Sequence, residues 1–132
     1  MGWHNTGCLA IMNETDEDFT VIDGENQGYS IVVPSHGSNT FNGVIFPWCD
    51  DALDIRQKAF RFFRGAADPP NGSFYMFEWY PETIYWTRYN WVPGGYAEAS
   101  FENRVHAGAP TSSYVVVGIG TDFTPRAVQA MA

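Results

Sequence analysis

The sequence predicts an all-β protein with a single domain, residues 1–132, folded as an antiparallel β-sandwich, with a small closed β-barrel as the alternative. Three observations support this prediction. Aromatic residues make up 17% of the chain, and Gly (13) and Pro (8) are plentiful. Short apolar runs bounded by turn formers recur about every ten residues, which is typical of sandwiches and barrels. With 45% hydrophobic residues, the chain has enough apolar surface for one core.

The first third of the chain alternates strand-like runs with turns. CLAIMN (8–13) is a short apolar run, and FTVID (19–23) alternates apolar and polar residues. YSIVVP (29–34) ends at a proline, which cannot donate to a sheet ladder. The segment SHGSNTFNG (35–43) is rich in turn formers and is expected to be a loop. It leads into a short strand at 44–46.

The segment 47–65 fits both a helix and a strand. Asp50 or Asp51 can cap a helix there, and basic residues follow near its end. The aromatic density toward its end suits a sheet better. We therefore expect a short helical turn at 50–55, followed by a strand at 57–64.

The second half of the chain is dominated by two aromatic strands, 73–80 and 83–91. The Val-Pro-Gly-Gly sequence after them is the clearest turn signal in the chain. A strand is expected at 96–102, and the almost wholly apolar run at 114–120 is expected to be buried on both faces. The tail, 121–132, lacks a strong pattern and is expected to be flexible or to dock as a short helix. The total is eight or nine strands and at most one short helix.

The pairing of the two aromatic strands depends on the turn between them. If Pro81 and Glu82 form a two-residue loop, Phe77 lies opposite Trp86. One face, expected in the core, then holds Tyr75, Phe77, Trp79, Ile84 and Trp86. The other face holds Met76, Glu78, Tyr80, Thr83, Tyr85, Thr87 and Tyr89. A shift of one residue in the turn would exchange partners between these faces.

The second face combines phenol rings, hydroxyls and one carboxylate, groups that suit sugars and polar head groups. The leading hypothesis is a soluble, lectin-like binding module that recognises carbohydrate or a polar lipid head group. The structural alternative is that Tyr and Thr simply favour the exposed face of a sheet. The predicted ligand-binding residues are Glu78, Tyr85, Thr87, Tyr89 and Trp91, with Asn39, Asn42 and Asp51 from loops.

Two further hypotheses concern catalysis and assembly. A cofactor-free β-barrel enzyme of the isomerase or cyclase type would act on an apolar small molecule, with Glu78 and Arg88 as its catalytic pair. A self-assembling protein would use surplus exposed aromatic residues as a homo-oligomer interface. No motif in the sequence specifies a reaction.

The net charge, the apolar runs and the cysteines indicate which partners and which cellular compartment to expect. The net charge of −8 argues against nucleic acid, although Arg56, Lys58, Arg61 and Arg64 form a basic cluster that we interpret as a solvated face. No apolar run is long enough for a transmembrane segment. Without a recognisable secretory signal, we expect cytoplasmic residence or non-classical export. Cys8 and Cys49 are expected to be free buried thiols, with pairing as the alternative.

Metal and cofactor sites are not expected. His4, His36 and His106 lack metal-ligand spacing. Residues 50–54, DDALD, match the aspartate-rich pattern that holds magnesium diphosphate in terpene synthases. Those enzymes are large helical bundles, however, and helix capping explains the same acids more simply.

Overall fold

The fold is all-β. The computed structural model describes residues 6–26, 29–64, 73–80, 83–88, 91–92, 96–97, 104–106 and 114–131. In that part of the chain no helix is long and apolar enough to cross a membrane. The elements are β1 (Gly7–Asn13), β2 (Phe19–Asp23), β3 (Ser30–Val33), β4 (Ser38–Ile45), α1 (Ala52–Lys58), β5 (Phe60–Arg64), β6 (Ser73–Trp79), β7 (Thr83–Arg88), β8 (Trp91–Val92), β9 (Tyr96–Ala97), β10 (Arg104–His106), β11 (Tyr114–Ile119) and β12 (Pro125–Met131).

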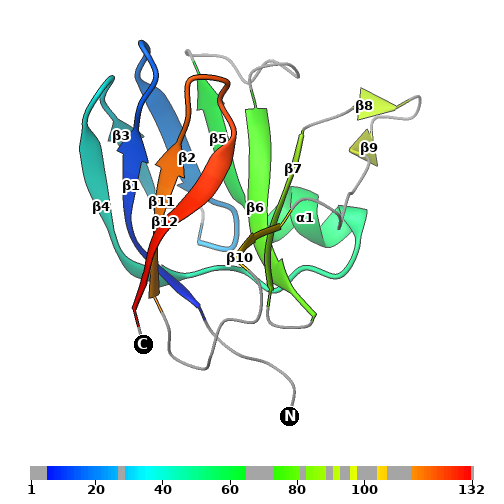
Figure 1. The fold of residues 1–132 in the computed structure, drawn as a ribbon. Helices are drawn as coiled ribbons and strands as arrows, with labels where there is room; N and C mark the ends of the chain where they lie inside the picture. The colour runs from blue at the N-terminus through cyan, green and yellow to red at the C-terminus, as the bar shows by residue number, and fades with distance from the viewer. Residues whose placement is uncertain are drawn as a thin grey trace.

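Two sheets face each other across the core (Figure 1). One has four strands in the order β12-β11-β1-β4, and the other has six in the order β10-β7-β6-β5-β2-β3. The edge strands β3 and β4 contact each other across the layers, as do β10 and β12. The sandwich prediction is confirmed, and the closed-barrel alternative is wrong for the described part of the chain. The strands β8 and β9 form a separate two-stranded sheet.

In the described part of the chain β1 and β11 pair in parallel, which corrects the purely antiparallel prediction. β11 runs parallel to β1, with Ile11 paired to Val117, whereas β4 runs antiparallel to β1 on its other side. β11 is a central strand between β1 and β12, and Val115, Val117 and Ile119 are fully buried. A continuous apolar run is typical of such a strand. The sequence indicated its burial but not the direction of its partner.

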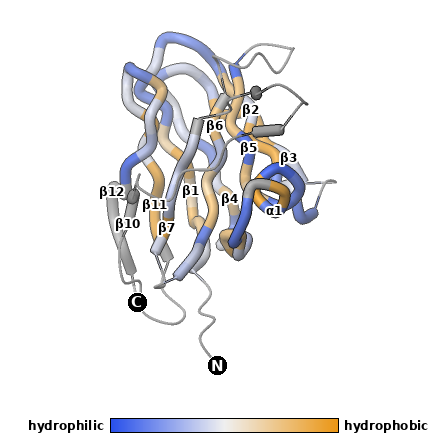
Figure 2. The backbone as a smooth tube through the Cα atoms, turned by 90° about the vertical axis from the view of Figure 1, so that its right-hand side faces the viewer, coloured by the Kyte–Doolittle hydropathy of each residue, from blue (hydrophilic) through white to orange (hydrophobic). Residues whose placement is uncertain are grey.

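The main core lies between the sheets and is rich in phenylalanine. The rings of Phe62 and Phe74 stack at a centroid distance of 4.6 Å, and Phe123 meets Phe74 edge-on at 5.0 Å. Figure 2 shows apolar stretches along the central strands β1 and β11. The buried residues of this cluster are Cys8, Ile11, Phe19, Val21, Val33, Phe41, Phe46, Phe60, Phe62, Phe74, Met76, Ile84, Val115, Val117, Ile119 and Phe123.

The segment 35–43, expected to be a loop, is mostly strand. β4 begins at Ser38, and its register with β1 places Phe41, Asn42 and Gly43 opposite the single residue Leu9. Asn42 and Gly43 have left-handed backbone φ values of 55° and 71°, which Asn and Gly tolerate best. The turn-like composition therefore marks a bulge within a strand rather than a loop.

Three other boundaries differ from the prediction. The short helix is confirmed, but it continues to Lys58 before β5 begins at Phe60. The strand expected at 83–91 ends at Arg88, and the strand expected at 96–102 corresponds to β9, with residues 98–103 outside the described residues. The tail, expected to be flexible or to dock as a short helix, contains β12, which pairs antiparallel with β11.

The pairing of the aromatic strands is shifted by one residue from the prediction. Phe77 lies opposite Tyr85 and Trp79 lies opposite Thr83, because three residues rather than two separate β6 from β7. Three-residue connections are also common in hairpins. One face therefore holds Tyr75, Phe77, Trp79, Thr83, Tyr85 and Thr87. The opposite face holds Phe74, Met76, Glu78, Ile84 and Trp86.

Most side chains on both faces of this hairpin are buried, although Tyr80, just after β6, is 65% exposed. Phe74, Met76 and Ile84 belong to the core between the sheets. Tyr85 and Thr87, predicted on a ligand-binding surface, are each only 3% exposed. Since polar and apolar residues are buried alike, alternation along β6 and β7 does not distinguish inside from outside.

Glu78 joins three segments that are distant in sequence. Its backbone N–H donates to the Pro47 carbonyl at 2.8 Å, and its carbonyl accepts from Cys49 N at 3.0 Å. Its fully buried carboxylate accepts from the backbone N and from Oγ1 of Thr6, at 3.1 and 3.3 Å. β6 is thereby linked both to the chain that enters α1 and to the chain that enters β1.

Replacing Glu78 with Ala should lower the free energy of unfolding by roughly 2–3 kcal/mol, because it leaves the buried groups of Thr6 without this acceptor. Glu78→Gln keeps the shape and one acceptor oxygen and should cost less. Urea unfolding of both variants, followed by tryptophan fluorescence, measures the difference. Equal stability of Glu78→Ala and the wild type would contradict this role.

The two cysteines are free and buried, as expected. Burial raises the pKa of Cys8 to about 12. Burial, followed by the nearby Asp54 carboxylate, also raises the pKa of Cys49. Both groups are therefore neutral thiols, shielded from reagents, at and well above neutral pH.

A thiol reagent at mildly alkaline pH should therefore leave the folded protein unmodified, whereas both cysteines should react once guanidinium unfolds the chain. Rapid labelling of either cysteine in the native protein, located by peptide mass spectrometry, would show that the thiols are accessible and contradict the prediction.

Candidate functional site

α1 forms a third layer on the outer face of the six-stranded sheet (Figure 1). The Asp51 carboxylate caps the helix by accepting from Asp54 N at 2.8 Å, as the sequence predicts. Ile55 is the central buried residue of the helix. A second cluster, distinct from the main core, packs the helix onto the sheet: Cys49, Ile55, Ala59, Tyr75, Phe77 and Tyr85, with Trp79 at its margin.

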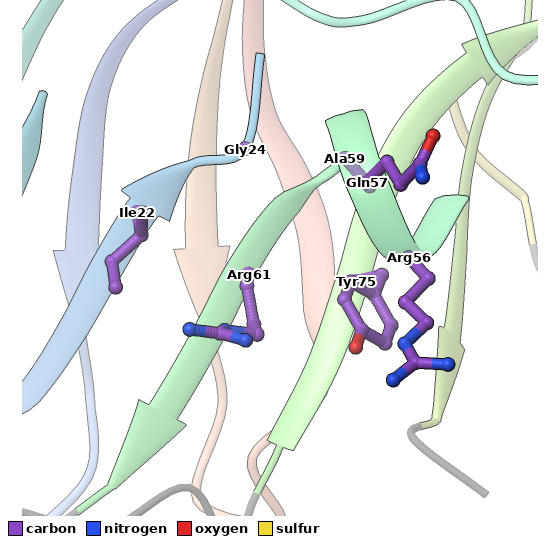
Figure 3. Close-up of a pocket in the computed structure, with 7 residues that line it drawn as sticks. All are labelled: Ile22, Gly24, Arg56, Gln57, Ala59, Arg61 and Tyr75. Carbon is purple, nitrogen blue, oxygen red and sulfur yellow. The ribbon is translucent and has the colours of Figure 1, made fainter. Parts of the chain in front are cut away.

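Beside the helix lies a pocket that we name the α1 groove. Its volume is about 580 Å³. Figure 3 shows Arg56 and Gln57 on the helix, Arg61 on β5 and Tyr75 on β6 around it. The lining residues are Ile22, Gly24, Arg56, Gln57, Ala59, Arg61 and Tyr75.

The sheet register builds the floor of the α1 groove. Ile22 on β2 pairs with Arg61 on β5, and Arg61 pairs in turn with Tyr75 on β6. Side chains at paired positions stand next to each other on the same face. An aliphatic group, a guanidinium and a phenol thus form one row across three adjacent strands.

A close contact of backbones forms one wall of the groove. Gly24 N donates to the Ala59 carbonyl at 3.2 Å, just after the end of α1. A Cβ on Gly24 would lie only 2.8 Å from that oxygen and 2.9 Å from the Gln57 carbonyl oxygen. A side chain at this position would therefore push β2 and the helix apart.

The two arginines of the groove are held differently. Arg56 is exposed on α1, whereas Arg61 is half-buried on β5, which has neighbouring strands on both sides. The Arg61 guanidinium also lies 5.5 Å from the centroid of the Phe63 ring, a cation–π distance.

The acids at the start of α1 lie close together. The carboxylate oxygens of Asp50, Asp51 and Asp54 lie within 4.8 Å of one another. A hydrogen bond between the side chains of Asp50 and Asp54 raises the pKa of Asp50 and lowers that of Asp54. Capping and charge at the helix start account for this cluster without a bound ion.

The structure does not bring the predicted ligand-binding residues together. Glu78 lies on the core side of the hairpin, whereas Tyr85 and Thr87 lie on the helix side. Tyr89 lies outside the described residues, and Trp91 belongs to β8, where it pairs with Ala97.

The predicted loop residues also lie apart from the hairpin. Asn39 and Asn42 belong to β4, an edge strand of the other sheet. The Asn39 amide donates to the Val32 carbonyl at 3.0 Å, and the Asn42 amide donates to the Tyr29 hydroxyl at 3.3 Å. These side chains therefore tie β4 to the segment around β3.

The predicted catalytic pair is separated along the hairpin. Glu78 pairs with Ile84, whereas Arg88 pairs with Phe74, four residues away along β6. That separation corresponds to roughly 13 Å of strand. The closed barrel that would have enclosed both groups is also not formed, as described above.

The groove residues were not among the predicted site residues, although one signal for them was present. Four of the seven basic residues fall between positions 56 and 64. Lys58 bonds to Asp54 at 3.5 Å, and Arg64 bonds to Glu17 at 3.3 Å. Arg56 and Arg61 also line the α1 groove, so the cluster is more than a solvated face.

Comparisons with protein-family models, with curated protein sequences and with solved structures find no match to this chain.

Replacing Gly24 with Ala should destabilise the protein by about 1–3 kcal/mol, because the atoms that its Cβ would meet are rigid backbone. Gly120→Ala is the matched control, since there the nearest atom, at 3.2 Å, belongs to the Asp122 side chain. Thermal unfolding compares the two variants. Equal losses of thermal stability in the two variants would contradict a special role for the contact between Gly24 and the end of the helix.

Proposed function

We propose that this protein is a lectin-like binding module that holds a small polyhydroxylated ligand, a sugar or the sugar-like head group of a lipid, in the α1 groove. The observation that carries the proposal is a concave site lined by two arginines and a glutamine together with apolar residues. Small-molecule sites are commonly about 300–1,000 Å³ and combine apolar lining with a few placed polar groups. The groove volume, about 580 Å³, lies in that range.

The lining chemistry suits a hydroxylated ring. Gln57 offers both a donor and an acceptor, and the guanidinium groups of Arg56 and Arg61 offer several donors in fixed planes. Ile22, which is partly exposed, provides apolar surface for the C–H face of a sugar. The hydrogen bonds of Arg56, Arg61 and Gln57 would therefore orient the ligand, while the apolar surface would provide van der Waals contact.

The aromatic hairpin supports this site from below rather than forming its surface. Tyr75 belongs to the groove floor, is only 1% exposed and is the register partner of Thr87. Tyr85 packs in the same cluster under α1. Of the rings that suggested a lectin-like protein, Tyr85 therefore packs under the helix that carries Arg56 and Gln57.

A glycan array and a pull-down with glycolipid liposomes test the proposal, followed by NMR titration of the ¹⁵N-labelled protein with the best ligand. We expect amide shifts in α1, β5 and around Gly24. Gln57→Ala should weaken binding about fivefold to tenfold, as expected for the loss of one hydrogen bond.

Arg126→Met is the control, because Arg126 is 54% exposed and pairs with Glu14 rather than lining the groove. It should bind like the wild type. Blank results on both the array and the liposomes at high protein concentration, or shifts confined to another surface, would end the proposal.

A further inference from the structure

The strands β3 and β4 form one side of the sandwich. Each is an edge strand of its sheet, and the two contact each other across the layers (Figure 1). Edge strands present backbone N–H and C=O groups with which a strand of another molecule can pair. The groups on this side therefore determine whether a second copy of the chain can add a strand to either sheet.

β3 has the composition of a strand that pairs readily with another. Residues 29–33, YSIVV, contain β-formers and neither a charge nor a proline, which is typical of segments that associate edge to edge. Val32 is also 55% exposed. Such a strand at the edge of a sheet needs protection if the protein is to stay dispersed.

The register of β3 shows which of its backbone groups face outward. Asp23 N donates to the Tyr29 carbonyl at 3.1 Å, and hydrogen-bonded pairs alternate with non-bonded pairs along an antiparallel ladder. Ser30 and Val32, at alternate positions of the pairing with β2, therefore turn their backbone groups away from β2. These are the groups that an added strand would use.

The side chain of Asn39 occupies backbone groups of both edge strands. Its Nδ2 donates to the Val32 carbonyl at 3.0 Å, and its Oδ1 accepts from Thr40 N at 2.9 Å. The bond from Asn13 N to the Gly37 carbonyl sets the same alternation on β4, so Thr40 N also faces away from β1. One amide thus fills an acceptor of β3 and a donor of β4.

The position of Asn39 on β4 lets it reach across to β3. Side chains alternate along a strand, so Asn39 lies on the same face as the fully buried Phe41. A second contact lies beside it, where the Asn42 amide donates to the Tyr29 hydroxyl at 3.3 Å. The Tyr29 ring packs 5.0 Å from the Phe41 ring. Side chains rather than backbone pairing therefore close this side of the sandwich.

We infer that Asn39 blocks this edge and keeps a second copy of the chain from adding a strand to β3. A strand that pairs there needs the Val32 carbonyl as an acceptor, and the Asn39 amide already bonds to it. Side chains that prevent strand addition are a general means of keeping β-proteins apart. Self-assembly through this edge, one form of the assembly that the aromatic-rich sequence suggests, is thereby prevented in the native protein.

Asn39→Leu tests the inference, because leucine has a similar size but neither donor nor acceptor. In sedimentation velocity the mass of this variant should rise with protein concentration, whereas that of the wild type should not. Hydrogen exchange measured by mass spectrometry should show residues 29–33 becoming protected as the variant associates. In dilute solution, NMR should show the Thr40 amide exchanging about fivefold to tenfold faster than in the wild type, as expected for the loss of one hydrogen bond.

Three further variants serve as controls. Asn39→Ser, whose side chain is too short to reach Val32, should associate like Asn39→Leu and replaces it if the leucine variant does not fold. Adding Val32→Lys to either variant should restore a constant mass, because lysine on an edge strand opposes strand addition. Thr20→Leu adds apolar surface beside Val32 on the central strand β2 without freeing the edge, and it should behave like the wild type.

Four results would overturn the inference. The first is a constant mass for both Asn39 variants with the fold retained, as verified by circular dichroism. The second is association that Val32→Lys does not reverse, since it would come from another surface. The third is protection of residues 29–33 that rises with concentration in the wild type, because the edge would then be open. The fourth is unfolding of both variants, because Asn39 would then serve the fold rather than the edge.

Discussion

The hydrogen bonds of Glu78 are the interaction on which the arrangement of this fold most depends. Its backbone pairs with the segment around Trp48 in a parallel bridge, and that segment leads into α1. Its carboxylate, buried on the face of β6 that points into the core between the sheets, accepts two hydrogen bonds from Thr6. A charge inside a protein is costly unless donors surround it. A single residue of β6 thus positions both the helix layer and the start of the four-stranded sheet.

The position of the helix creates the α1 groove. The bridge at Trp48 directs the chain across the outer face of β6, where Ile55 packs into the cluster that contains Tyr75, Phe77 and Tyr85. The helix is only seven residues long and packs over Tyr75, Phe77 and Tyr85. Its end is held against Gly24 by the bond from Gly24 N to the Ala59 carbonyl. The groove is the space left between this short helix and the strands β2 and β5.

Much of the fold follows from local signals. Apolar run length, turn spacing and the acids that cap α1 predict an all-β sandwich with one short helix. The hairpin register depends on one residue of turn length, which Pro81 and Glu82 do not determine. The parallel partner of β11 depends on a contact between the two ends of the sequence. The Asn42-Gly43 pair suits a turn and a bulge equally, because both need positive φ. Local composition does not distinguish these alternatives.

The candidate site was harder to predict because the outer face of the hairpin is buried under α1. On a half-exposed sheet, alternating polar residues mark the solvent face. Here Thr83, Thr87 and Glu78 are all buried, so polarity along the hairpin does not indicate exposure. Charge is more informative, since burying a guanidinium costs much more than burying a hydroxyl. Arg61, an arginine on a central strand between Ile22 and Tyr75, is therefore the residue that best marks the groove, but its neighbours become known only with the register.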